Sequence, residues 1–72
     1  MIPVGKKGRI VQGVHAGWFV FIQDDSASTG GFLILIAEDK DFKGQGFDSW
    51  VENQDKLEQY FRYANWQIDW LE

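Results

Sequence analysis

The chain has 72 residues, no cysteine and a formal net charge of −4. A chain of this length forms one domain, so residues 1–72 are expected to fold as a single unit. The lack of cysteine excludes disulfides, thiolate metal sites and cysteine nucleophiles. The negative charge disfavours non-specific binding to nucleic acid, because it does not attract phosphates.

The first residues contain neither the apolar run nor the small-residue cleavage pattern of a signal peptide. The longest apolar run of the chain is far shorter than a membrane span. We therefore expect a cytoplasmic protein that does not associate with membranes.

Three strands are predicted in the first half of the chain, at residues 9–14, 18–22 and 32–37. Each is short, rich in β-branched or aromatic residues, and bounded by turn-forming residues. Gly13 weakens the first strand and indicates a bulge. The short connection at Gly17 makes the three strands an antiparallel meander.

The opening of this meander is similar to that of KOW-like small barrels. The similarity consists of Gly5 and Gly8 followed by Ile10 and Val11, a turn at Gly17 and then Val20, and it covers about a third of the chain. The resemblance implies a barrel that contacts RNA through basic residues, here Lys6, Lys7 and Arg9. The acidic balance of the whole chain argues against such contacts.

The second and third strands do not alternate between apolar and polar residues. In the second, Trp18, Val20 and Ile22 face one way, while Phe19 and Phe21 face the other. Both faces of this hairpin therefore need a cover.

Polar segments follow both central strands. Residues 24–31 predict a polar loop at the tip of the hairpin, and residues 38–46 a charged, exposed loop whose one large apolar residue is Phe42. A short fourth strand is predicted at residues 47–51.

A helix is predicted after Asn53, which serves as its N-cap, and Asn65 is a suitable left-handed terminator. The alternation after the helix predicts a last strand at a sheet edge with one wet face. The apolar stripe of the helix is Leu57, Tyr60, Phe61 and Ala64, and that of the last strand is Trp66, Ile68 and Trp70.

These elements predict an α+β fold. It consists of an antiparallel sheet of four to five strands, curled or partly barrel-like, with one C-terminal helix packed on it and a final strand. A helix of about 11 residues is roughly 16 Å long and covers one face only. The second face must be closed by curling of the sheet, by the long loop bringing in Phe42 and Phe47, or by another protein.

The residues that could carry chemistry form no catalytic pattern. His15 is the only histidine, and no serine stands in a triad or nucleophile-elbow spacing. Asp24 and Asp25 lack the spacing of a calcium loop, because the twelfth residue counted from Asp24 is Leu35. We expect no enzymatic activity, no cofactor and no metal site.

Aromatic residues beside acidic loops are typical of a surface that recognises a basic protein. A concrete form is an immunity-type inhibitor of a nuclease toxin, whose carboxylates imitate phosphate charge. One alternative is a homo-oligomeric structural or assembly subunit, possible as a homodimer, whose apolar sheet face is covered by a second copy. A further alternative is the KOW-like nucleic-acid-binding barrel. The candidate partner-binding residues are Trp18, Asp24, Asp25, Glu38, Asp39, Asp41, Asp48, Trp50 and Tyr63.

Overall fold

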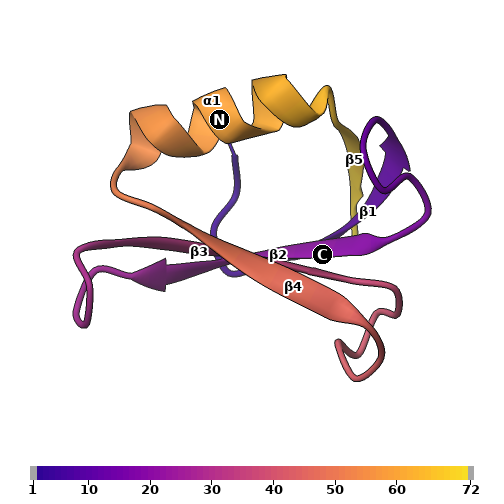
Figure 1. Cartoon of the computed structure of the whole chain (residues 1–72), viewed down its shortest axis with the longest axis horizontal. Helices are drawn as coiled ribbons and strands as arrows, with labels where there is room; N and C mark the ends of the chain where they lie inside the picture. The colour runs from indigo at the N-terminus through magenta and orange to yellow at the C-terminus, as the bar shows by residue number, and fades with distance from the viewer. Residues whose placement is uncertain (1, 72) are drawn as a thin grey trace.

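The computed structural model describes residues 2–71, which form five strands and one helix (Figure 1). The element order follows the expected one, with four strands, the helix and a last strand. The bounds are β1 Lys7–Gln12, β2 Phe19–Asp25, β3 Gly31–Ala37, β4 Gly46–Val51, α1 Gln54–Ala64 and β5 Gln67–Trp70.

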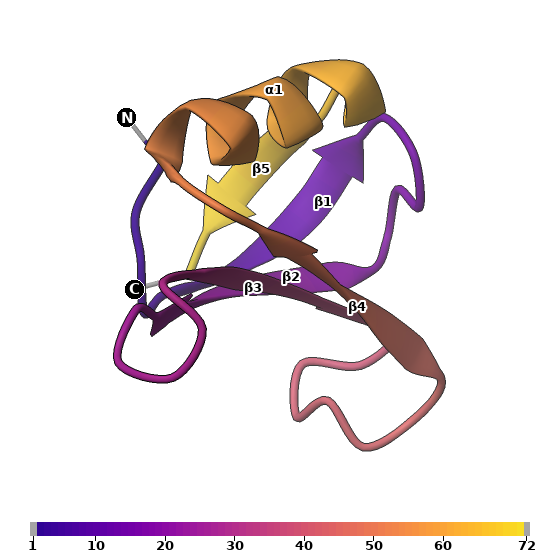
Figure 2. The same ribbon diagram turned by 60° about the vertical axis from the view of Figure 1, so that its left-hand side comes forward.

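The strands form one antiparallel sheet in the order β4-β3-β2-β1-β5. The first four strands are a meander, and β5 returns to pair with β1 (Figure 2). The predicted α+β fold is therefore confirmed. Within residues 2–71 the edge strands β4 and β5 are not paired with each other, so the sheet is curled but not closed.

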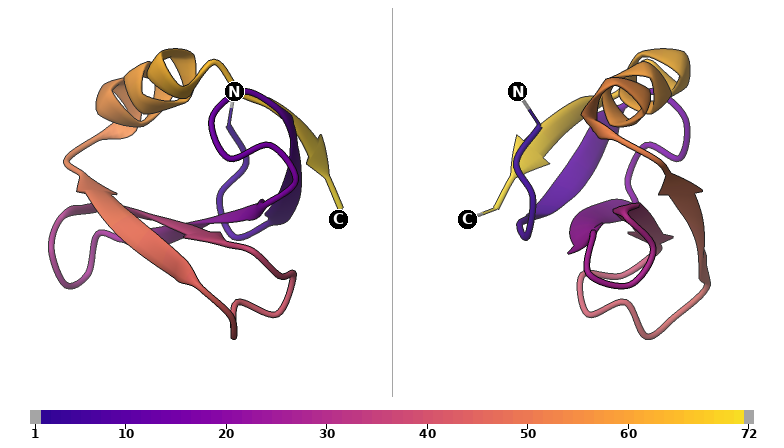
Figure 3. Two further views of the ribbon diagram at one scale, coloured as in Figure 1. Left: turned by 45° about the vertical axis from the view of Figure 1, so that its right-hand side comes forward. Right: turned by 90° about the vertical axis from the view of Figure 1, so that its left-hand side faces the viewer.

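Helix α1 lies over one face of the curled sheet, between its two edges (Figure 3). We call this the inner face, and it holds the core. Every second residue of the central strands points into it, as a pleated strand requires. The fully buried cluster consists of Ile10, Val20, Ile22, Ile34, Ile36 and Leu57.

Both ends of the helix are capped as the sequence predicts. The Asn53 side chain accepts a hydrogen bond from the Lys56 N–H at 2.9 Å, which satisfies one free donor of the first turn. Asn65 is in the left-handed conformation, and its N–H donates to the Arg62 and Phe61 carbonyls. On the inner side, Leu57 and Ala64 are buried, and the Tyr60 hydroxyl lies 3.3 Å from the Ser49 hydroxyl of β4.

Two strands differ from the predicted bounds by more than one residue. β1 begins at Lys7 and ends at Gln12, earlier at both ends than predicted. β2 extends through Asp25, because its pairing with β3 continues from Phe19 to Asp25 without interruption. The predicted hairpin loop therefore shrinks to residues 26–30.

The turn after β1 is locked against the C-terminal end of the helix. The Val14 N–H donates to the Ala64 carbonyl at 3.0 Å, and the Trp66 indole N–H donates to the Val14 carbonyl at 2.6 Å. Gly13 has a φ of 106°, and a Cβ there would collide with the carbonyls of Ala64 and Asn65. The predicted bulge at Gly13 is misplaced, because Gly13 lies beyond the end of β1 and the β1–β5 register shifts between Ile10 and Gln12.

We expect Gly13→Ala to destabilise the fold far more than Gly17→Ala. Both glycines have a positive φ, which costs a side chain about 1 kcal/mol. At Gly17 an added Cβ would meet open space, whereas at Gly13 it would meet backbone, which adds about 1–3 kcal/mol. Urea unfolding of the two variants measures the difference, and equal losses would contradict this close approach.

Candidate partner-docking surface

The face of the sheet away from the helix, which we call the outer face, is apolar along its centre. Its central side chains come from the alternate residues of β2 and β3 that do not enter the core, and all are half-buried. The β3–β4 loop adds Phe42, and β4 adds Trp50. We call this set the outer apolar patch: Phe19, Phe21, Leu33, Leu35, Phe42 and Trp50.

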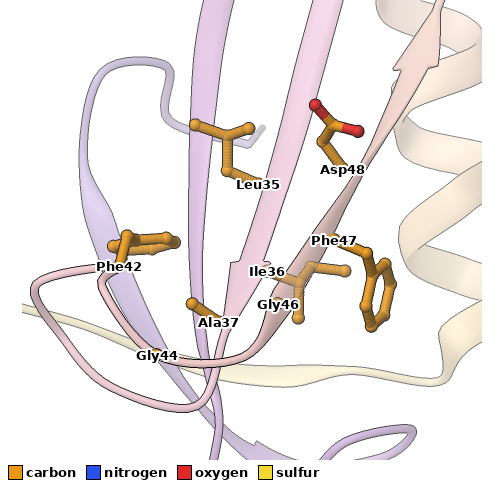
Figure 4. A pocket seen from close by; sticks show the side chains of 8 residues that line it. All are labelled: Leu35, Ile36, Ala37, Phe42, Gly44, Gly46, Phe47 and Asp48. Atoms are coloured by element: carbon orange, nitrogen blue, oxygen red, sulfur yellow. The ribbon is translucent and has the colours of Figure 1, made fainter.

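Phe42 reaches this patch because its backbone adopts an unusual conformation. Its φ is 58°, a left-handed value that costs a non-glycine residue about 1–2 kcal/mol. The ring packs edge-on against Phe21 at a centroid distance of 6.4 Å, and the Lys7 ammonium lies 5.7 Å from the ring centre. The loop thus covers part of the outer face. The predicted second residue, Phe47, instead lies on the helix side (Figure 4).

Trp50 is fixed at the hairpin end of the same face by a chain of hydrogen bonds. Its indole N–H donates to the Thr29 hydroxyl at 2.7 Å, and that hydroxyl donates to an Asp25 carboxylate oxygen at 2.9 Å. The ring lies over Gly31, where a Cβ would collide with it. Trp50 is held in place although 49% of its surface is exposed.

An open pocket of about 440 Å³ lies between the β3–β4 loop and the strands β3 and β4 (Figure 4). Leu35 and Ala37 form its floor on the outer face, Phe42 stands on one side and Asp48 on the other. The side chains that line the pocket are apolar except for the Asp48 carboxylate, which suits an apolar side chain accompanied by a cation.

Charges flank the outer apolar patch unevenly. Lys7 and Arg9 project from β1, on one side, and Asp48 projects from β4, on the other. Arg9 stands opposite Asp69 of β5 in the register. Of the basic cluster that the KOW resemblance would use for RNA, Lys7 therefore lies against Phe42 and Arg9 has an acidic residue as its neighbour on β5.

The acidic candidates other than Asp48 lie at two opposite ends of the sheet. Asp24 and Asp25 form the end of β2, whereas Glu38, Asp39 and Asp41 follow β3 in the loop at the other end (Figure 1). Asp24 and Asp25 belong to the strand and not to the loop predicted for them, because β2 pairs through Asp25. The structure therefore brings the candidates together within each group and keeps the groups apart.

Several of these carboxylates organise their own loops. Asp39 accepts hydrogen bonds from the N–H groups of Gly44 at 2.7 Å, Lys43 at 3.1 Å and Asp41 at 3.3 Å. The Gly44 N–H, with help from the other two, lowers the pKa of Asp39. At the other end, the backbone N–H of Ser26 lowers the pKa of Asp24 in the same way.

Two aromatic candidates lie away from the outer face. Trp18 packs against the core and, with His15 and Phe47, closes one end of it at ring distances of 4.9–6.3 Å. Tyr63 is 93% exposed on the helix, on the opposite side of the molecule from the outer apolar patch. Among the candidates, Trp50 and Asp48 stand on β4 opposite Leu33 and Leu35 of the outer face, and Asp25 reaches Trp50 through Thr29.

Five residues of the outer apolar patch were missed as site residues, and one signal could have found them. Phe19, Phe21, Leu33 and Leu35 occupy the second face of strands that do not alternate. Phe42 is the isolated apolar residue of a charged loop. When a strand has apolar residues on both faces and only one face belongs to the core, the apolar residues of the other face indicate a second contact surface.

Comparison of the chain with protein-family models, with curated proteins and with solved structures gives no match. Within residues 2–71 no group of three or more His, Asp or Glu side chains is placed to hold a metal ion, and no polar or charged side chain is buried.

The helix that the structure describes in residues 2–71 is neither long nor apolar enough to cross a membrane.

We expect Thr29→Val to release Trp50 from its fixed orientation. The change keeps the shape of the side chain but removes the hydrogen bonds that the hydroxyl makes with Trp50 and Asp25, at a cost of about 1 kcal/mol in unfolding free energy. The Trp50 indole N–H should shift in NMR spectra and exchange faster with water. Ser28→Ala in the same turn is the control, and an equal effect there would contradict the proposed chain.

We expect the stabilising effect of Asp39 to disappear in acid. Because its folded-state pKa is lowered, its contribution is fully present above the unfolded pKa, about 3.9, and is lost as the pH falls through the folded value. The difference in melting temperature between the wild type and Asp39→Ala should therefore be constant near neutral pH and shrink below about pH 4. A difference that stays constant down to about pH 3 would contradict this role of the Asp39 carboxylate.

Proposed function

We propose that this protein is a non-catalytic protein-interaction domain that docks a protein partner on the outer face of its sheet. The observation that carries the proposal is the outer apolar patch, which the helix cannot reach and the β3–β4 loop covers only in part. Half-buried aromatic and leucine side chains of this kind gain free energy when a partner removes them from water.

The composition of the outer face supports binding. An aromatic anchor that is already held in place loses little side-chain entropy on association, and Trp50 is held in this way by Thr29. The apolar centre is bordered by charged residues, which is the arrangement of a protein interface with an apolar core and a polar rim. Binding of a partner would thus explain why β2 and β3 carry apolar side chains on the outer face as well as on the inner one.

A basic protein is the second candidate partner, as for an immunity-type inhibitor. It is favoured by the net charge of −4 and by the hairpin end, where Asp25 and Trp50 are joined through Thr29. Electrostatic steering would then speed association. In this version the association rate with the purified basic partner should fall steeply as salt rises.

In-cell photo-crosslinking tests the proposal. A photoreactive amino acid at the position of Leu33, on the outer face, should give discrete adducts, and one at Gln59, exposed on the helix, should not. The adducted protein is identified by mass spectrometry, and its affinity is measured with purified components. Leu35→Lys should weaken that affinity by about tenfold or more, because it places a charge in the apolar centre.

Adducts from both positions alike, or none from Leu33, would overturn this assignment. Binding that is unchanged by Leu35→Lys would do the same, provided that the variant melts as a folded protein.

A further inference from the structure

One cross-strand row of the outer face is self-complementary. Read across the sheet, it consists of Lys7 on β1, Phe21 on β2, Leu35 on β3 and Asp48 on β4. The row is therefore basic at one end, apolar in the middle and acidic at the other end. A second copy turned end for end presents the opposite charge at each position.

We propose that the partner on the outer face is a second copy of this chain, related by a two-fold axis that runs parallel to the strands between β2 and β3. The inference rests on the function proposed above and names its partner. Such an axis places β1 of one copy opposite β4 of the other, and β2 opposite β3. Lys7 of each copy then faces Asp48 of the second copy, and Phe21 faces Leu35 across the interface.

The shape of the outer face follows the same symmetry. Phe42 rises above β2, where it packs on Phe21 next to Lys7. The open pocket lies on the other half of the face, above Leu35 and Ala37 of β3 and beside Asp48. The two-fold axis brings the Phe42 ring of each copy over the pocket of the other. The interface would therefore contain two equivalent contacts in which a Phe42 ring enters a pocket.

The two charges cannot serve each other within one chain. Lys7 and Asp48 are separated by β2 and β3, that is, by three strand spacings or about 14 Å between backbones. Lys7 and Asp48 can therefore attract each other at short range only between two molecules. A partner of unrelated sequence would have to reproduce this charge pattern, whereas a second copy supplies it by symmetry.

The available area sets the expected strength. Laid flat, four strands of about six residues would make a face of roughly 19 by 20 Å, or about 400 Å², and the curl of the sheet reduces the part that a second copy can touch (Figure 3). Even with the added relief of the side chains, this lies at the small end of specific interfaces, which bury about 800 Å² per partner. We therefore expect a reversible dimer with a Kd in the micromolar range.

Sedimentation equilibrium of charge-swap variants tests the arrangement. Lys7→Asp alone puts two acids opposite each other at each contact, and Asp48→Lys alone puts two bases there, so each should raise the dimer Kd about tenfold or more. The double variant restores opposite charges and should return the Kd to within about threefold of wild type. An equimolar mixture of the two single variants should form a heterodimer that is tighter than either homodimer.

Lys56→Asp and Asp55→Lys are the matched controls, because they change the net charge equally on the exposed side of the helix. Thermal melts verify that every variant is folded. A dimer that does not respond to the swaps, or single variants that the double variant does not rescue, would overturn the two-fold arrangement.

The outcome is separable from that of the proposed function. A chain that is monomeric at all concentrations, but whose Leu33 probe crosslinks to a different identified protein, overturns the second copy and leaves the docking function intact. A monomer without outer-face crosslinks overturns both.

Discussion

The structure depends on one mismatch between the sheet and the helix. The central strands β2 and β3 carry apolar side chains on both faces, and the helix that follows β4 is 11 residues long. A helix of that length shields one side of a small sheet. The core therefore forms on the helix side from the isoleucines and Leu57, while the other side is left to a loop and to whatever binds there.

The β3–β4 loop partly compensates for this mismatch by covering some of the outer face. The β3–β4 loop bends through a left-handed residue so that the Phe42 ring reaches Phe21. The loop is in turn held by Asp39, whose carboxylate collects three backbone N–H groups. A side chain that suggests charge recognition in the sequence thus has a structural task, and the acidic character of the chain is partly a means of building turns.

How far the sequence predicts the fold depends on whether the signal is local. The helix with its caps at Asn53 and Asn65, and the edge strand after it, follow from short-range patterns and are confirmed. The extension of β2 through Asp25 could not be read locally, because pairing with β3 outweighs the turn preference of two aspartates. The candidate site is less predictable than the fold. The sequence shows that the sheet has a second apolar face, but it does not show that Phe42 and Trp50 converge on that face. Convergence depends on loop geometry and on cross-strand register, both of which are long-range.

The pairing of β5 with β1 has a consequence for how the protein is made. The first strand obtains its second neighbour only from residues 67–70, so the sheet cannot be completed while those residues are still inside the ribosome. Such long-range pairing slows folding, because the entropy of closing the chain between β1 and β5 is lost before their contacts can stabilise the sheet. Until then one edge of β1 is unpaired and the core face of the meander lacks its cover, because the helix also follows the first four strands in the chain. The incomplete nascent sheet is therefore the form of this protein that exposes the most apolar surface.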